Sequence, residues 1–124
     1  MPVLKKILLR KVEKPWGKYE DICREDGVVL KKIIVNPKQR LSLQTHQQRA
    51  EFWVVVDGEC LCELGPNIQR LKKWDTIQIE IGQLHRLIND TNEPCEVIEL
   101  QFGLCIESDI IRHEDDYSRA EPPF

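Results

Sequence analysis

The chain has 124 residues, 41% of them hydrophobic and 31% charged, which is typical of one compact globular domain rather than a disordered protein. Its net charge is −3 and its Lys and Arg residues are scattered, which argues against nucleic acid as the main partner, because phosphate-backbone binding needs a clustered basic surface. No apolar run is long enough to span a bilayer, and the start MPVLKKILLRKVEKPWG lacks the features of a signal peptide. We therefore expect one cytoplasmic domain that does not bind membranes.

Short strands separated by turn signals fill the chain between an N-terminal arm, about residues 1–20, and an extended tail, about residues 118–124. The expected strands cover residues 28–35, 40–46, 51–56, 59–64, 75–81, 84–89 and 95–103. Asp57-Gly58 predicts a two-residue hairpin between the third and fourth of these strands. The chain thus has the close strand spacing of an antiparallel sandwich or small barrel.

Only residues 107–117 are expected to form a short helix, with Ser108 or Asp109 as its N-cap. The five cysteines are odd in number and include no CxxC pair, so they do not predict a disulfide framework. Cys60 and Cys62 lie two residues apart and share one strand face. We interpret them as buried thiols in a reducing compartment.

Four polar residues stand out as candidate metal ligands: Gln44, His46, Glu51 and His85. Gln44 and His46 share the polar face of one expected strand, Glu51 begins the next, and His85 lies in the other half of the chain. If they converge, one carboxylate, one amide oxygen and two imidazoles would suit Zn²⁺, or alternatively Mn²⁺, Fe²⁺, Co²⁺ or Ni²⁺. A half-buried strand with its polar side in water would explain the same spacing.

The spacing of these residues resembles the two-part cupin signature. The first part is matched by His46, Glu51 and Gly58, with Lys38 in place of the opening glycine and Gln44 in place of a histidine. The second part is matched by Gly82, His85 and Asn89, with Glu80 in place of a proline. The resemblance implies an all-β cupin fold, a double-stranded β-helix or jelly-roll barrel.

A narrower resemblance covers nearly the whole chain. The stretches KPWGKYE, QRLSLQTHQQRAEFWVVVDG, GQLHRLIN and SDIIRHEDDYSR resemble the type II mannose-6-phosphate isomerase domain, which in that family usually follows a mannose-1-phosphate guanylyltransferase domain. The family favours a histidine-rich run before Arg-Ala-Glu, where this chain has Gln47 and Gln48. The resemblance implies a metal-dependent enzyme that interconverts mannose 6-phosphate and fructose 6-phosphate.

This reaction would need a metal to stabilise oxygen charge, a group that carries a proton, and a cation that binds phosphate. The residues proposed to carry the proton are Lys31, Glu80 and Glu99, none of which the sequence singles out. Arginine binds phosphate with two parallel hydrogen bonds. Arg49 is the first choice for the phosphate and a candidate catalytic residue, and Arg40 and Arg86 are the second choices.

Two other functions compete with the isomerase. One is a non-catalytic cupin that binds a sugar phosphate or sugar nucleotide and acts with a separate guanylyltransferase; the departures at Gln47 and Gln48 motivate it. The other is an iron-dependent, oxygen-using cupin. Such sites usually resemble a set of three histidines and one glutamate, and Gln44 in place of one histidine weighs against this function. We also expect a homodimer, because LLRKVEK near the start could pair as an edge strand.

Overall fold

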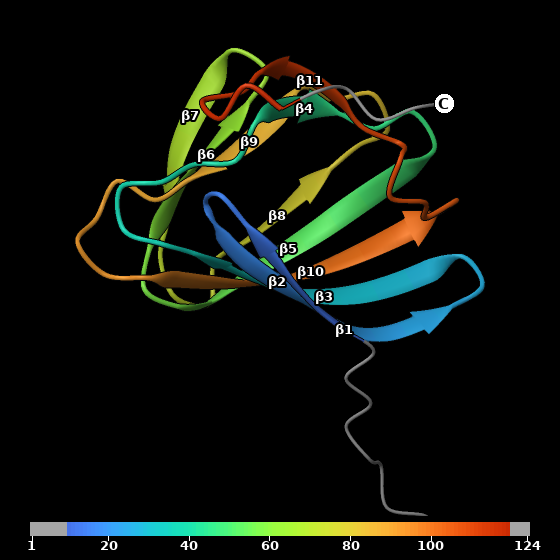
Figure 1. Ribbon diagram of the computed structural model, residues 1–124, viewed down its shortest axis with the longest axis horizontal. Coiled ribbons are helices and arrows are strands. Elements are labelled where there is room, and N and C mark those ends of the chain that lie inside the picture. Colours follow the sequence, from blue (N-terminus) through green and yellow to red (C-terminus); the bar gives the residue numbers. More distant parts are fainter. Residues whose placement is uncertain (1–9, 120–124) are drawn as a thin grey trace, which may run out of the picture.

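The computed structural model describes residues 10–119, which form two facing antiparallel sheets (Figure 1). The six-stranded sheet contains, in spatial order, β1 (Arg10–Lys14), β2 (Gly17–Glu25), β3 (Val28–Val35), β10 (Cys95–Gly103), β5 (Arg49–Asp57) and β8 (Thr76–Ile79). The five-stranded sheet contains β11 (Ile111–Glu114), β4 (Leu43–Thr45), β9 (His85–Ile88), β6 (Cys60–Leu64) and β7 (Asn67–Leu71). This arrangement confirms the predicted all-β jelly roll.

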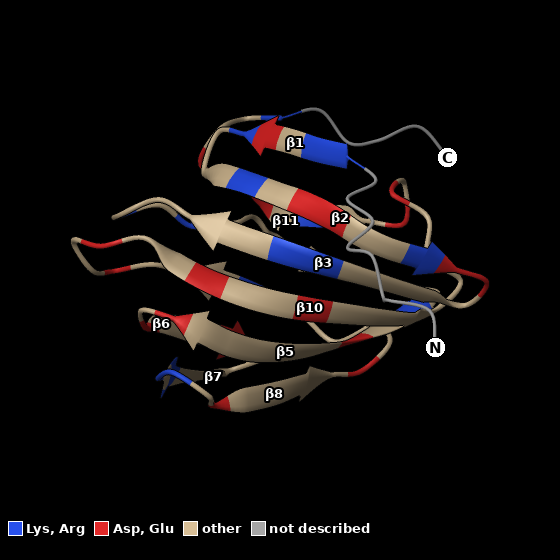
Figure 2. Cartoon of the chain, turned by 90° about the horizontal axis from the view of Figure 1, so that it is seen from below, with Lys and Arg blue, Asp and Glu red and all other residues tan. Residues whose placement is uncertain are grey.

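The interior is built by strict alternation along the long strands. In β10 the side chains of Cys95, Val97, Glu99 and Gln101 are buried, while the residues between them are partly exposed. Figure 2 shows the strands of the six-stranded sheet in order from β1 to β8, with charged residues side by side on β3 and β10. Some of these charges face inward, because Lys31 and Glu99 are both buried and opposite each other in register.

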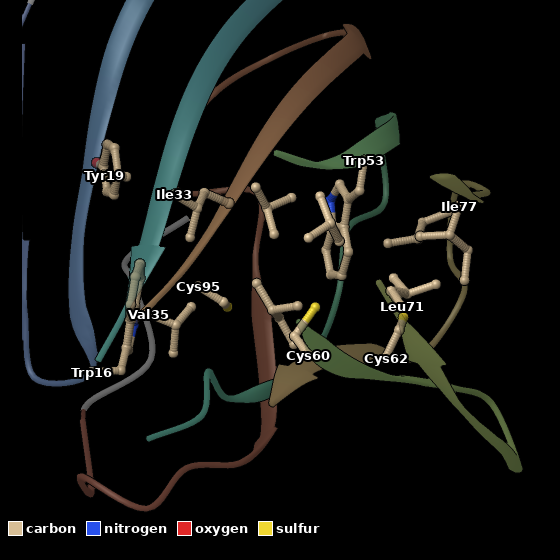
Figure 3. Close-up of a cluster of buried hydrophobic side chains, with 14 residues drawn as sticks. Trp16, Tyr19, Ile33, Val35, Trp53, Cys60, Cys62, Leu71, Ile77 and Cys95 are labelled. Atoms are coloured by element: carbon tan, nitrogen blue, oxygen red, sulfur yellow. The ribbon is translucent and has the colours of Figure 1, made fainter. Parts of the chain in front are cut away.

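An apolar cluster fills one end of the space between the sheets (Figure 3). It includes Trp16, Ile33, Val55, Leu87 and Val97, each no more than 4% exposed. Cys60, Cys62 and Cys95 are buried in the same cluster as free thiols. Their position agrees with the predicted role of Cys60 and Cys62 as packing residues.

The hairpin predicted at Asp57-Gly58 is wrong. β5 pairs with β10 and β8, whereas β6 pairs with β7 and β9, so the chain crosses from one sheet to the other at this turn. Gly58 has φ +71°, and a Cβ there would lie 2.7 Å from the carbonyl oxygen of Pro94. The glycine therefore serves a close backbone approach between loops.

The short helix predicted over residues 107–117 is also wrong. Residues 111–114 instead form β11, which pairs with β4 and extends the five-stranded sheet. Asp109 does not cap a helix, since its carboxylate accepts hydrogen bonds from the backbone N–H groups of Gln47 and Gln48, at 2.8 and 2.9 Å. Pairing with the β4 edge thus outweighed the weak local helical pattern.

Sequence reasoning also missed the hairpin of β1 and β2 and the edge strand β7. Residues 10–20 of the predicted arm belong to the six-stranded sheet; residues 1–9, and residues 120–124 of the predicted tail, lie outside the described residues. Within residues 10–119, no helix has the length and apolar character needed to cross a membrane.

Candidate metal centre

Three buried side chains meet between the two sheets. Glu51 lies near the start of β5, His46 directly follows β4, and His85 begins β9. Their ligand atoms all lie within 4.8 Å of one another. Glu51 Oε2 is 3.2 Å from His46 Nε2, and Glu51 Oε1 is 3.6 Å from His85 Nε2. The fold thus brings together three of the four predicted ligands.

Backbone carbonyls orient both imidazoles. His46 Nδ1 donates to the carbonyl oxygen of Asp109 at 2.7 Å, and His85 Nδ1 donates to that of Gln83 at 2.8 Å. Because a carbonyl can only accept, each ring carries a proton on Nδ1, and its Nε2 is the atom directed at Glu51. This tautomer and orientation are those of metal-binding histidines. Burial lowers the pKa of His46 to about 4, so that ring is neutral at pH 7.

Glu51 is held as a carboxylate by two neighbouring donors. Arg49 Nε donates to Glu51 Oε2 at 3.0 Å, and Trp53 Nε1 donates to Glu51 Oε1 at 3.2 Å. Burial alone would raise the pKa of Glu51, but contacts with the two histidines and Arg49 hold it well below its ordinary value. An ionised carboxylate beside two imidazole nitrogens is the donor set that suits a divalent transition metal.

Gln44 lies next to this group on the same face of the sheet. It is opposite His85 in register, and both residues line a cavity between the two sheets. Its Nε2 donates to the carbonyl oxygen and the hydroxyl of Ser42, at 3.2 and 3.0 Å. The amide oxygen is therefore the atom that Gln44 could offer to a metal. Its role as a fourth ligand remains a prediction.

A cavity of about 470 Å³ lies between the sheets beside the candidate ligands. Glu51, His85 and Gln44 contribute to its wall. Seven of its lining residues are Lys or Arg and three are Glu, although the whole chain carries a net charge of −3. The excess of cations around an interior space favours an anionic ligand.

Glu99 and Lys31 lie side by side on the cavity wall formed by the six-stranded sheet. Burial, together with the negative charge of neighbouring Glu51, raises the pKa of Glu99 to about 8. Gln101 Nε2 donates to Glu99 Oε1 at 2.9 Å. Lys31 Nζ lies 2.7 Å from Glu107 Oε1. Glu99 is therefore able to gain or lose a proton near neutral pH.

Two of the predicted residues lie outside the cavity. Glu80 is exposed and accepts a hydrogen bond from Gln78 at 2.9 Å. Arg40 forms two hydrogen bonds with Asp116, at 2.7 and 2.9 Å, on the exterior. Neither residue is part of the cavity wall. The structure therefore does not bring Glu80 or Arg40 to the candidate site.

Arg86 and Arg49 line the cavity, and both guanidinium groups already lie beside carboxylates. Arg86 follows His85 in β9, so its side chain leaves the opposite face of the sheet, where it lies 3.3 Å from Glu114 and 3.6 Å from Glu63. Arg49 donates to Glu51, to the carbonyl oxygen of Ile106 at 3.2 Å, and lies 3.4 Å from His46. Arg49 therefore orients the candidate ligands.

Sequence reasoning missed several residues of the site. Lys14, Glu107, Arg112 and Arg119 line the cavity, and Gln101 supports Glu99. For Gln101 a signal existed, because the alternation of β10 places it on the buried face. Arg112 was not recognised because residues 107–117 were expected to form a helix. Gln47 and Gln48 have exposed side chains and do not contribute to the cavity wall.

Comparison with known sequences supports the family resemblance. The family described as "Mannose-6-phosphate isomerase C-terminal" matches residues 5–115. The chain is 41% identical over 112 residues to the xanthan biosynthesis protein XanB of Xanthomonas campestris, and 39% identical over 113 residues to the alginate biosynthesis protein AlgA of Pseudomonas aeruginosa. It covers 24% of each relative, and these matches span 90% of this chain. A mannose-1-phosphate guanylyltransferase of Escherichia coli is 39% identical over 112 residues, 90% of this chain and 23% of its own length.

Solved structures agree on the fold. The capsular polysaccharide assembling protein CapF of Staphylococcus aureus has a TM-score of 0.72 at 16% identity, over 85% of this chain and 34% of that one. A predicted oxalate decarboxylase from Thermotoga maritima has a TM-score of 0.70 at 16% identity, over 83% of this chain and 100% of that one. At this identity the likeness establishes the double-stranded β-helix and nothing about the reaction.

Proposed function

Because the chain belongs to the mannose-6-phosphate isomerase C-terminal family, we propose that it is a metal-dependent isomerase that interconverts mannose 6-phosphate and fructose 6-phosphate. The observation that carries this proposal is the group of His46, Glu51 and His85, with both Nε2 atoms directed at the carboxylate, on the wall of a cation-rich cavity. The chain spans about a quarter of the relatives it matches, so their whole activities are not transferred to it.

His46, Glu51 and His85, together with Gln44, would hold the metal ion. Zn²⁺ is our first candidate because it accepts nitrogen and oxygen ligands in this number; Mn²⁺, Fe²⁺, Co²⁺ and Ni²⁺ are the alternatives. When bound, the ion would supply positive charge that stabilises the developing charge on the O1 and O2 atoms of the sugar. Arg49 would keep Glu51 ionised and in position.

Glu99 is the residue that we propose to carry the proton between C1 and C2. Ionised Glu99 would remove the C2 proton of mannose 6-phosphate, the resulting carboxylic acid would return that proton to C1, and the hydroxyl proton of O2 would pass to O1. The proposal is supported by its position on the cavity wall and by its pKa of about 8, since general bases work best near the pH of the reaction. Neighbouring Lys31 would favour the ionised form.

The test is an assay of mannose 6-phosphate conversion by the purified protein, combined with elemental analysis. We expect turnover that chelator abolishes and added divalent metal restores. A metal-loaded, folded protein that leaves the substrate unchanged would contradict the isomerase. If calorimetry then shows binding of mannose 6-phosphate without turnover, the non-catalytic binding function takes its place.

We also propose that the protein forms a homodimer through β1. This strand is at the edge of the six-stranded sheet, where backbone groups are open to pairing. Its outward residues Lys11 and Glu13 are exposed. Light scattering of the purified chain tests the proposal, and a monomer at micromolar concentration would contradict it.

A further inference from the structure

Three cations from two chain segments gather at one part of the cavity wall. Lys14 ends β1, Arg112 lies in β11, and Arg119 follows β11. β1 and β11 each lie at one edge of their sheet, and Figure 2 shows β11 behind the β2 and β3 region. Alternation along β1 places Val12 and Lys14 on the less exposed side, where both line the cavity. We name Lys14, Arg112 and Arg119 the edge cations.

Arg112 and Arg119 both lie close enough to Lys14 to oppose its positive charge. Burial, followed by the charges of Arg119 and Arg112, lowers the pKa of Lys14. Arg119 is held by Asp115, whose Oδ2 accepts from its Nε at 2.9 Å and whose Oδ1 accepts from its Nη2 at 3.0 Å. Among residues 10–119, no carboxylate lies within ion-pair distance of Lys14. An anion bound at this position would relieve the repulsion.

Two cations nearer the candidate metal ligands, Arg49 and Lys31, are each paired with carboxylates, as Arg119 is with Asp115. Arg49 contacts Glu51, and Lys31 contacts Glu107 and lies 3.7 Å from Asp21. A phosphate placed there would compete with these carboxylates and suffer their repulsion. Lys14, which has no carboxylate within ion-pair distance among residues 10–119, is therefore the cation best placed to receive an anion in this cavity, with Arg112 and Arg119 beside it.

Strand register places the edge cations at a suitable separation from the candidate ligands. Arg112 is opposite Gln44, and Gln44 is opposite His85, so the three residues form a row across the five-stranded sheet. Neighbouring strands are about 4.8 Å apart, so Arg112 and His85 are separated by about 10 Å of backbone. A hexose phosphate has its phosphate at the far end of the sugar from C1 and C2. It could therefore span this row.

We propose that Lys14, Arg112 and Arg119 bind the phosphate of a hexose 6-phosphate, and that Arg49, the choice from sequence, does not. This inference rests on the proposed function for the identity of the ligand. It adds a specificity-determining subsite that selects phosphorylated over free sugars.

Calorimetry on the metal-free protein tests the subsite separately from catalysis. Mannose 6-phosphate, mannose and inorganic phosphate are titrated into the wild type and into the variants Lys14→Met and Arg112→Met. We expect the wild type to bind mannose 6-phosphate more tightly than mannose, and each variant to lose roughly 10- to 100-fold in affinity for mannose 6-phosphate, the usual effect of a charge-assisted hydrogen bond. Inorganic phosphate should compete with mannose 6-phosphate for the wild type.

Matched controls separate a local from a general effect. Lys11→Met removes an exposed lysine from the same strand and should change affinity less than twofold. Arg112→Lys keeps the charge and should restore most of the binding. If Arg112→Met does not fold, Lys14→Met on the edge strand still decides the matter, with a thermal melt as the check on folding.

The outcomes distinguish the subsite from the proposed function. If Lys14→Met loses binding of mannose 6-phosphate and the wild type shows no isomerase activity, the subsite is supported and the isomerase is contradicted. Active protein whose KM for mannose 6-phosphate is unchanged in Lys14→Met and Arg112→Met keeps the isomerase and overturns the subsite. Wild type that binds mannose and mannose 6-phosphate equally also overturns it.

Discussion

The two ends of the space between the sheets are built from the same strands but have opposite chemistry. Along β9, His85 belongs to the candidate metal centre, and Leu87, two residues later on the same face, belongs to the apolar cluster at the point where that cluster meets the cavity. Along β10, Glu99 lines the cavity and Val97 is packed in the cluster. One alternating strand therefore contributes both to stability and to the site, and a shift of two residues exchanges one role for the other.

This division explains how buried charges are tolerated. The apolar end supplies hydrophobic burial, which is the main favourable term in folding. The polar end buries Glu51, Arg49 and Glu99, whose desolvation is costly unless they are paired. Mutations at the polar end should therefore affect function more than stability.

The largest expected effect is that of His85→Ala. Loss of one of the proposed ligands should reduce turnover of mannose 6-phosphate by about 10³-fold, the upper range for removal of a group that stabilises oxygen charge. Metal content, measured by elemental analysis after dialysis, should fall together with activity. His113→Ala is the matched control, because exposed His113 is bonded to Thr45 outside the cavity. Equal activity in the two variants would remove His85 from the centre.

The second largest effect is expected for Glu99→Gln. Its turnover should fall at least about 100-fold, because general acid–base catalysis contributes about this factor, and its metal content should be unchanged. Glu96→Gln, on the same strand but paired with Lys32, should retain activity. The coupled isomerase assay and elemental analysis measure both variants. Full activity of Glu99→Gln would assign the proton transfer to another residue.

Leu87→Ala tests the apolar end of the comparison. Leu87 is fully buried, so the variant should lose about 3 kcal/mol in free energy of unfolding. Urea denaturation measures the loss, and below the transition the folded protein should still bind metal. Leu104→Ala, at a position 56% exposed, should change stability little. A variant that keeps its stability but loses metal would show that the two ends are not separable.

The smallest expected effect concerns acid stability and Asp115. Burial opposes its ionisation, but hydrogen bonds from Arg119 and the backbone lower its pKa to about 2. A depressed folded-state pKa contributes stability above the unfolded value, near pH 4, that is lost as pH falls toward 2. Asp115→Asn should therefore flatten the stability curve in this window, measured by thermal melts. An unchanged slope between pH 4 and pH 2 would contradict the assignment.

The sequence predicted the fold and much of the candidate centre because both depend on short-range patterns. Alternation located most strands, and the resemblance to the cupin signature implied that His46, Glu51 and His85 are neighbours. The Asp57-Gly58 prediction failed because a tight turn does not reveal whether its strands pair or separate into two sheets. Arg112 and Asp109 were missed because their roles depend on pairing with segments more than 60 residues away.

Asp109 has a consequence for the order in which the site is completed during biosynthesis. Its carbonyl orients His46 and its carboxylate holds the backbone of Gln47 and Gln48, although 63 residues separate it from the histidine. A nascent chain that ends before Asp109 already contains His46, Glu51 and His85 but lacks the acceptor that sets the His46 tautomer. Tight metal binding should therefore begin only after Asp109 has been synthesised, which couples metal loading to a late stage of folding.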